Sequence, residues 1–474
     1  MKFILYSRFN EEAIQSHLGE PGYGYYFVLK AFQQVLTDLG SIEVVRNPET
    51  EVDPIFKSCR ATGEPCLFLS FASPNTIPLD LECPTVPVIA WEFSTIPDGG
   101  WDENTRNDWR FVLGKIGRAI ALSGHSARVI AEEMGPQFPI AAVPVPIQNR
   151  AADAFPAEPV SAGFRIRSQG TILDTATMKL DVNVLAPAAP RPGGDSVGCG
   201  GDDQRLMRRG LISGSAFFER IVEIIRGLGG QQPELERGEE GEVKAGEVVQ
   251  SHVRLSAGGV VYTAVVNPGD RHKNLSDLVT AFCWAFRDIA DATLVLKVGD
   301  NGLQAFYSTI IPVLYRLSPF QCRVLVLPGF LADDEYDQLI RATTYYVNGS
   351  NAEGLCMPLM EFMTCGKPAI APAHTAMADY IDNDVAFVLR ASRQIAAWPD
   401  DPRQLYRTMC YRLDWGSLLE AYRQSYRLAT TAPGDYREMS KRARARLEGY
   451  ASSTIVKGQL RDFFSSSLGD TTTD

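Results

Sequence analysis

The stretch "SNAEGLCMPLMEFMTCGKPAIAP", residues 350–372, decides how the second half of this chain folds. An apolar run at 345–347 precedes it, and the apolar run "AIA" lies at its end. Pro358 suits the first turn of a helix, and Gly366 suits the end of one. The stretch therefore predicts a strand, a short helix at about 358–365 and a second strand.

Two glutamates in this stretch, Glu353 and Glu361, are eight positions apart. Eight residues of an ideal helix rise about 12 Å and rotate about 80° beyond two whole turns. We expect Glu361 in the first turn of the helix and Glu353 in the loop before it, where helix amides favour an anion. Two carboxylates with an anion site between them suit a ligand made of a sugar, a diphosphate and a ribose. The alternative is that a first-turn carboxylate only complements the helix dipole.

Short apolar runs alternate with helical patterns along most of the chain. Such runs are typical of parallel sheets covered by helices on both faces. The 474 residues exceed the usual limit of about 250–300 residues for one core, so we expect an α/β protein with two doubly wound domains. The predicted strands are 3–6, 42–45, 66–71, 86–91, 118–122, 140–145, 260–266, 293–298, 323–328, 345–347, 369–371 and 386–389, and the predicted helices include 25–38, 125–134, 275–289 and 333–342.

The middle of the chain differs in composition from both halves. It is rich in proline, glycine and glutamate and shows little periodicity, apart from a predicted amphipathic helix at 215–230. The predicted organisation is a first domain at 1–150, an inserted and partly disordered region at 151–258, a second domain at 259–450, and a C-terminal helix with a tail at 451–474.

Charge and cysteine content restrict the partners and the compartment. A net charge of −11 argues against nucleic acid as the main partner, because phosphate backbones need surplus lysine and arginine. The nine cysteines include no CxxC pair, which favours reduced thiols in a cytoplasmic protein over disulfides or a zinc site. No run of about 18 apolar residues predicts a membrane span. The basic run "KRARAR" at 441–446 has two interpretations, peripheral contact with anionic lipid or a solvated helix face.

The stretch 350–372 resembles the E-x7-E signature of the retaining, GT-B-fold glycosyltransferases of family 4, whose usual form is close to S-x-x-EGF-G-x-x-x-LEAMA-x-G-x-PVIA. The resemblance implies two Rossmann-like domains that face each other across a cleft. It also implies that Glu353 contacts hydroxyls of the donor sugar and that Glu361 binds the nucleotide ribose. Cys356 stands where the family often has glycine. The backbone next to the first glutamate is implied to lie near the sugar and phosphates, at Gly354, Leu355, Cys356 and Met357.

Two further segments of the second half resemble the same family. "NPGDRHKNLSDLVTAF" at 267–282 resembles its phosphate-binding loop, so Lys273 is implied to reach the diphosphate. Arg271 is the arginine closest in sequence to the position where the family has its second cation. The alternative is that Arg271 is only a solvated charge in the loop. "LPGFLADDEYDQLI" resembles the segment whose backbone contacts the base, here at Phe330 and Leu331.

Two segments of the first half also fit this resemblance. "GEPGYGYYFVLKAF" resembles the glycine-rich loop before the first helix, where Gly22 and Gly24 would let the backbone approach donor phosphates or the acceptor. In "VIAWEFSTIP", Glu92 stands where many relatives carry a histidine. We expect Glu92 either to orient a sugar hydroxyl and stabilise positive charge at the anomeric carbon, or to act only as a capping or loop acid.

The resemblance implies a metal-independent hexosyl- or glycosyltransferase without a cofactor, whose donor substrate is a nucleotide-diphosphate sugar. The implied acceptor is a glycan or lipid-linked molecule, in polysaccharide, lipopolysaccharide or other glycoconjugate biosynthesis. Two alternatives stay open. One is a non-catalytic assembly partner that binds another protein through 151–258, and the other is a sugar-nucleotide epimerase or hydrolase.

Overall fold

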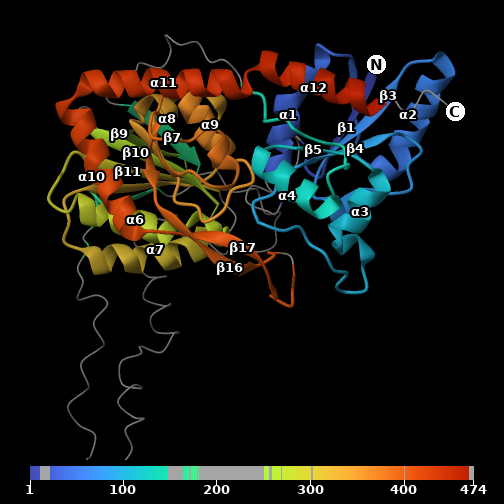
Figure 1. The fold of residues 1–474 in the computed structure, drawn as a ribbon. Helices are drawn as coiled ribbons and strands as arrows, with labels where there is room; N and C mark the ends of the chain where they lie inside the picture. The colour runs from blue at the N-terminus through green and yellow to red at the C-terminus, as the bar shows by residue number, and fades with distance from the viewer. Residues whose placement is uncertain are drawn as a thin grey trace, which may run out of the picture.

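The computed structural model describes two α/β domains that lie side by side (Figure 1). The long helix α11 (Pro433–Ala451) runs along the second domain, and α12 (Ser453–Leu468) continues over the first. The described residues are 1–10, 22–147, 164–169, 172–178, 180, 250–255, 259–267, 269–299, 303–399 and 401–468.

The first domain contains a parallel sheet of strand order β2-β1-β3-β4-β5-β6. Helix α12 completes its core, because Val456, Leu460 and Phe464 are buried there and the Phe464 ring lies 5.3 Å from that of Phe3. The elements are β1 (Lys2–Ser7), α1 (Gly24–Thr37), β2 (Ser41–Val44), α2 (Pro48–Thr62), β3 (Cys66–Phe71), β4 (Thr85–Ile89), α3 (Trp109–Ile116), β5 (Ala119–Ala121), α4 (Gly124–Met134) and β6 (Ile140–Ala142).

The second domain has the sheet order β15-β14-β13-β10-β11-β12-β8, parallel except for the short edge strand β8. From β10 the chain continues to β11 and β12 on one side of the sheet. It then returns to the other side of β10, where β13, β14 and β15 follow in order. The elements are β8 (Leu173–Asp174), β10 (Val260–Val266), α6 (Leu275–Ala285), β11 (Ala292–Val298), α7 (Leu303–Leu317), β12 (Arg323–Leu327), α8 (Asp333–Ala342), β13 (Tyr345–Val347), α9 (Met357–Thr364), β14 (Ala369–Pro372), β15 (Ala386–Leu389) and α10 (Trp415–Thr431).

All twelve strands predicted from apolar runs are present, with ends that shift by a few residues. One predicted position was wrong. Helix α9 begins at Met357, with Pro358 as its second residue, so Glu361 lies beyond the first turn and cannot be explained as a first-turn acid. Gly366 ends the helix with a φ of 74°, a left-handed conformation that favours glycine.

Parts of the predicted middle region, 151–258, pack on the second domain. Strands β7 (Phe164–Gln169) and β9 (Gln250–Leu255) form an antiparallel pair, and β8 joins the large sheet. The Ser168 hydroxyl donates to Pro328 O, which anchors this pair beside the end of β12. The predicted helix at 215–230 lies outside the described residues.

A hairpin that the sequence did not predict connects the two domains. Its strands are β16 (Ala391–Ala397) and β17 (Tyr406–Leu413), which extend from the second domain toward the first (Figure 1). Ser94 N–H donates to Met409 O at 3.3 Å, and Met409 N–H donates to Ser94 Oγ at 3.0 Å. The buried ring of Trp398 stacks on Trp101 with centroids 6.5 Å apart. Backbone bonds and aromatic packing therefore fix the hairpin to the first domain.

Candidate active site

The two neighbouring strands β10 and β13 bring the main candidate residues together. Lys273 follows β10 in the short turn η6 (Arg271–Lys273), and Glu353 follows β13 in the loop before α9. The order of the sheet reverses between these two strands. In open α/β sheets, ligands bind at the carboxyl ends of the strands at such a switch point. The topology alone therefore makes this loop pair the leading ligand site of the second domain.

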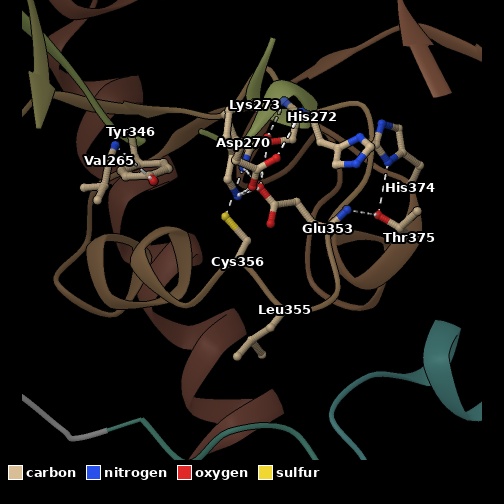
Figure 2. Close-up of polar contacts among 12 residues, drawn as sticks. Val265, Asp270, His272, Lys273, Tyr346, Glu353, Leu355, Cys356, His374 and Thr375 are labelled. Carbon is tan, nitrogen blue, oxygen red and sulfur yellow. Dashed lines mark hydrogen bonds and ion pairs between the residues drawn. The ribbon is translucent and has the colours of Figure 1, made fainter. Parts of the chain in front are cut away.

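The Glu353 carboxylate is held through one of its two oxygens (Figure 2). Lys273 Nζ, Ser350 Oγ and Asn348 Nδ2 donate to Oε1 at 2.6, 2.6 and 2.9 Å. The Glu353 N–H donates to Thr375 Oγ1 at 3.1 Å, which fixes the backbone as well. Oε2 accepts no hydrogen bond from the described residues. The carboxylate is thus oriented by one oxygen while the other can accept from a ligand.

Charge keeps both members of this pair ionised. Burial favours the neutral form of Glu353, but the Lys273 ammonium and the Ser350 and Asn348 donors outweigh it and lower the pKa of the carboxyl. Burial likewise opposes the charge of Lys273, but the negative charges of Glu353 and Asp270 raise the pKa of the amine above its ordinary value. The Lys273 side chain is 20% exposed, so part of it borders solvent.

Cys356 occupies a backbone position that favours glycine. It caps α9 with a φ of 61°, in the left-handed region, which costs a non-glycine residue about 1–2 kcal/mol. Asn348 Nδ2 donates to Cys356 Sγ at 3.0 Å. Burial, with the Glu353 charge, raises the pKa of this thiol, so the thiol stays neutral. The thiol thus packs beside Glu353 as a neutral group.

The loop that carries Glu353 lies against the first domain. A Cβ on Gly354 would be 3.0 Å from the backbone nitrogen of Trp91, so the close approach of the domains favours glycine there. Leu355 and Met357 pack against the core of the first domain. The Leu355 carbonyl accepts from Tyr380 Oη at 3.1 Å.

Glu361 lies on α9 and pairs with a tyrosine that the sequence analysis missed. Tyr336 Oη, on α8, donates to Glu361 Oε2 at 2.9 Å. Leu331 is buried and Phe330 is partly buried in the segment between β12 and α8, just before α8 begins. Lys297 Nζ donates to Val298 O at 2.9 Å and to Gly329 O, which fixes the segment just before Phe330.

The glycine-rich loop of the first domain borders the same region. Gly22 has a φ of 85°, which favours glycine, and a Cβ on Gly22 or Gly24 would meet no heavy atom of the described residues within 4 Å. Burial raises the pKa of Tyr23, an effect that the nearby Lys273 ammonium opposes. Tyr23 is therefore close to the Lys273 side of the site.

Glu92 is a partly buried carboxyl at the end of β4, in the first domain. Burial, together with the negative charges of Asp270 and Glu353, raises its pKa to about 8. Glu92 is therefore mostly protonated at neutral pH and can donate as well as accept a hydrogen bond. Its neighbour His125 donates from Nε2 to Phe93 O at 3.1 Å.

The structure places the backbone of Arg271 in η6, but its side chain lies outside the described residues. Roles for Ser350, Asn348, Thr375 and Tyr336 were not predicted from the sequence. A signal existed for Ser350, the first residue of the S-x-x-E string. The described residues contain no group of three or more His, Cys, Asp or Glu side chains that could hold a metal ion. Within the same residues, no helix is long and apolar enough to cross a membrane.

The family profile of the glycosyl transferases group 1 matches residues 323–408, which include Glu353 and Glu361. No curated protein sequence matches the chain. The structure is similar to sucrose-phosphate synthase from Thermosynechococcus elongatus (12% identity, TM-score 0.52, 99% of each chain covered). It is also similar to the Anabaena protein HepE in complex with UDP (14% identity, TM-score 0.50, 98% of this chain and 99% of that chain) and to a glycosyltransferase from Rickettsia africae (8% identity, TM-score 0.50, 98% of each chain). The chain therefore has the GT-B fold, as the resemblance implied.

Proposed function

We propose that this protein is a retaining glycosyltransferase that moves a sugar from a nucleotide-diphosphate sugar to an acceptor hydroxyl. One observation carries the proposal: the Lys273–Glu353 pair lies at the switch point of a GT-B nucleotide domain, with Glu353 Oε2 left for a ligand. The match to group 1 glycosyl transferases covers Glu353 and Glu361 and supports glycosyl transfer.

The donor would lie across the carboxyl ends of the strands of the second domain. Glu353 Oε2 would accept from hydroxyls of the donor sugar, and Glu361 from the ribose. The backbone of Phe330 and Leu331 would border the base. The diphosphate would lie between the Lys273 ammonium and the amides at the start of α9, which together supply positive charge. The backbone amides concerned are those of Gly354, Leu355, Cys356 and Met357.

Departure of the nucleotide diphosphate is the step that this site can assist. The bond between the anomeric carbon and the phosphate oxygen breaks, and the diphosphate keeps the electron pair. A bond forms from the acceptor oxygen to the same carbon, and the hydroxyl proton passes to the leaving phosphate. Lys273, with Arg271 and the α9 amides, would stabilise the leaving charge, so no metal ion is required. Loss of one preorganised donor of this kind typically lowers the rate about 100- to 1000-fold.

The first domain would present the acceptor. A Cβ on Gly22 or Gly24 meets no described atom within 4 Å, so the backbone there could approach a ligand. Glu92 lies near enough to Lys273 and Glu353 for their charges to affect its pKa, and its protonated carboxyl could orient a hydroxyl. We propose a glycan or lipid-linked acceptor in polysaccharide or other glycoconjugate synthesis. Contact with a membrane surface and a protein partner for residues 151–258 stay predictions.

A thermal-shift screen against UDP-, GDP-, ADP-, TDP- and CMP-sugars tests donor binding. UDP-sugars come first because the similar Anabaena structure holds UDP. A ligand at about 100 times its dissociation constant stabilises by about 2.7 kcal/mol, a visible change in Tm. We expect one nucleotide class to raise the Tm of the wild type and of the control Glu438→Gln, which changes an exposed carboxylate paired with Lys441 on α11. The same class should have little effect on Glu361→Gln.

Turnover then separates transfer from the alternatives. With the matching donor, Lys273→Met should lower the rate of sugar transfer at least about 100-fold, and chelation by EDTA should leave the wild-type rate unchanged. Product without an acceptor would instead indicate an epimerase or a hydrolase. If no nucleotide changes the Tm, the protein is an assembly partner and the proposal fails.

A further inference from the structure

A separate small cavity lies between the domains, beside Glu92. The first domain contributes Glu92, His125 and Arg128 to its lining, and the hairpin of the second domain contributes Arg393, Met409 and Tyr411. Its volume is about 110 Å³, which is room for roughly three to four water molecules. A cavity of this size has room for one end group of a larger molecule. Glu92 lines this cavity and also lies near Glu353 and Lys273, so the cavity adjoins the site described above.

The hairpin wall of this cavity is held in place from two sides. Tyr411 N–H donates to Asn351 O at 2.9 Å, and the Tyr411 ring stacks on His374 with centroids 4.2 Å apart and planes 7° apart. His374 in turn bonds through Nδ1 with Thr375 Oγ1, at 3.2 Å. Thr375 Oγ1 also accepts from the Glu353 N–H. The cavity wall and the Glu353 loop are therefore one connected structure.

Two guanidinium groups from different domains line the cavity. Arg128 Nη1 donates to Glu132 Oε1 at 3.0 Å, and its Nη2 lies 3.3 Å from His125 Nδ1, which fixes the guanidinium. Arg393 approaches from β16 on the other side. Arginine stays charged at all accessible pH values and binds carboxylate or phosphate through paired N–H groups. Glu132 balances one of these charges, and Glu92 is mostly protonated at neutral pH, so a net positive charge is left for a ligand.

We infer that this cavity receives the end of the acceptor next to the reacting hydroxyl, and that this end carries an anionic group, a phosphate or a carboxylate, bound between Arg128 and Arg393. The inference rests on the proposed function, because it assigns the acceptor end of the same site. It makes the hairpin a determinant of acceptor specificity.

The test measures acceptor-side binding with the donor side filled. The nucleotide that passes the thermal-shift screen is kept at saturation, so that it occupies the diphosphate site and anionic probes cannot bind there. Glucose, glucose 6-phosphate and glucuronate are then titrated calorimetrically into the wild type, Arg128→Gln, Arg393→Gln and Arg390→Gln. Arg390 is an exposed arginine paired with Asp414 and serves as the matched control outside the cavity.

We expect at least one anionic probe to bind about tenfold or more tightly than glucose, because a charge-assisted hydrogen bond contributes about 1.5–3 kcal/mol. The two anionic probes distinguish phosphate from carboxylate. Arg128→Gln and Arg393→Gln should each lower the affinity for that probe about tenfold and leave the affinity for the nucleotide unchanged. Arg390→Gln should change neither affinity. Equal affinity for glucose and both anions, or an anion preference that survives both cavity variants, overturns the inference while the proposed function stands. A protein that binds no nucleotide overturns both.

Discussion

At the residue scale, the protonation of Glu92 makes the stability of the protein depend on pH. Burial, with the charges of Asp270 and Glu353, raises its pKa from the ordinary 4.5 to about 8. Below pH 4.5 the carboxyl is protonated in the folded and the unfolded protein alike. Between pH 4.5 and about 8 the folded protein keeps a proton on Glu92 that the unfolded chain releases. The stability that this proton provides therefore falls as the pH rises from 4.5, and it is lost once the pH has passed about 8.

Glu92→Gln should remove this dependence, because the amide is neutral at every pH. We expect the variant to have a higher Tm than the wild type at pH 8.5, and a difference that shrinks as the pH falls toward 5. Calorimetry at several pH values checks this. A constant difference across the range would mean that Glu92 is ionised in the folded protein at neutral pH. If Glu92 also orients the acceptor, the variant will lose turnover as well, and equal kinetics would exclude that role.

At the element scale, the β16–β17 hairpin contributes to the core of a domain that it does not belong to. Trp398 and Cys410 are buried in a cluster with Trp91, Phe93 and Trp101 of the first domain. Trp398 Nε1 also donates to Thr95 O at 3.2 Å. The hairpin is therefore a structural connection between the domains as well as a wall of the cavity beside Glu92.

Trp398→Ala should lower the free energy of unfolding by about 3–5 kcal/mol, the usual cost of removing a buried tryptophan. We expect a larger loss than for Tyr406→Ala, because Tyr406 lies on the same hairpin and is 73% exposed. Chemical denaturation of both variants provides the comparison. Similar small losses in the two would show that the hairpin is not held against the first domain in solution.

The elements also show what a sequence can predict. Apolar strands such as 66–71 and 260–266 are buried on both faces, and composition alone located them. The hairpin was missed because β16 is mostly exposed and has no alternation of apolar and polar residues. Resemblance identified Lys273 and Glu353 as candidates. It did not predict that Ser350 and Asn348 bond to one carboxylate oxygen, because tertiary contacts determine that geometry.

At the scale of the whole molecule, the two domains meet closely at Gly354. A methyl group there would lie 3.0 Å from Trp91 N and 3.2 Å from Ala90 Cβ, closer than ordinary contact. A second interdomain contact is a charge-assisted bond, because the Gly124 N–H at the start of α4 donates to Asp379 Oδ2 at 2.7 Å. Tyr450 Oη donates to the same oxygen at 2.9 Å. The described arrangement is therefore a closed one.

Gly354→Ala should separate the domains slightly and lower turnover more than it lowers nucleotide binding. In the proposed function the nucleotide binds to the second domain, whereas transfer needs both domains in contact. Small-angle scattering should show a larger radius of gyration, and Gly434→Ala is the matched control because a Cβ there meets nothing within 4 Å. Unchanged scattering together with unchanged turnover would contradict this account.

The packing of α12 has a consequence for the order in which the chain can fold during synthesis. Val456, Leu460 and Phe464 fill the core around β1 and α1, although the ribosome makes them long after the last strand of that sheet. At about 5–20 residues per second, the ribosome needs roughly 15–65 s to pass from the last strand of the first sheet to this helix. During that interval the newly made first domain exposes an apolar surface, so it is the part of the nascent chain that most needs a chaperone.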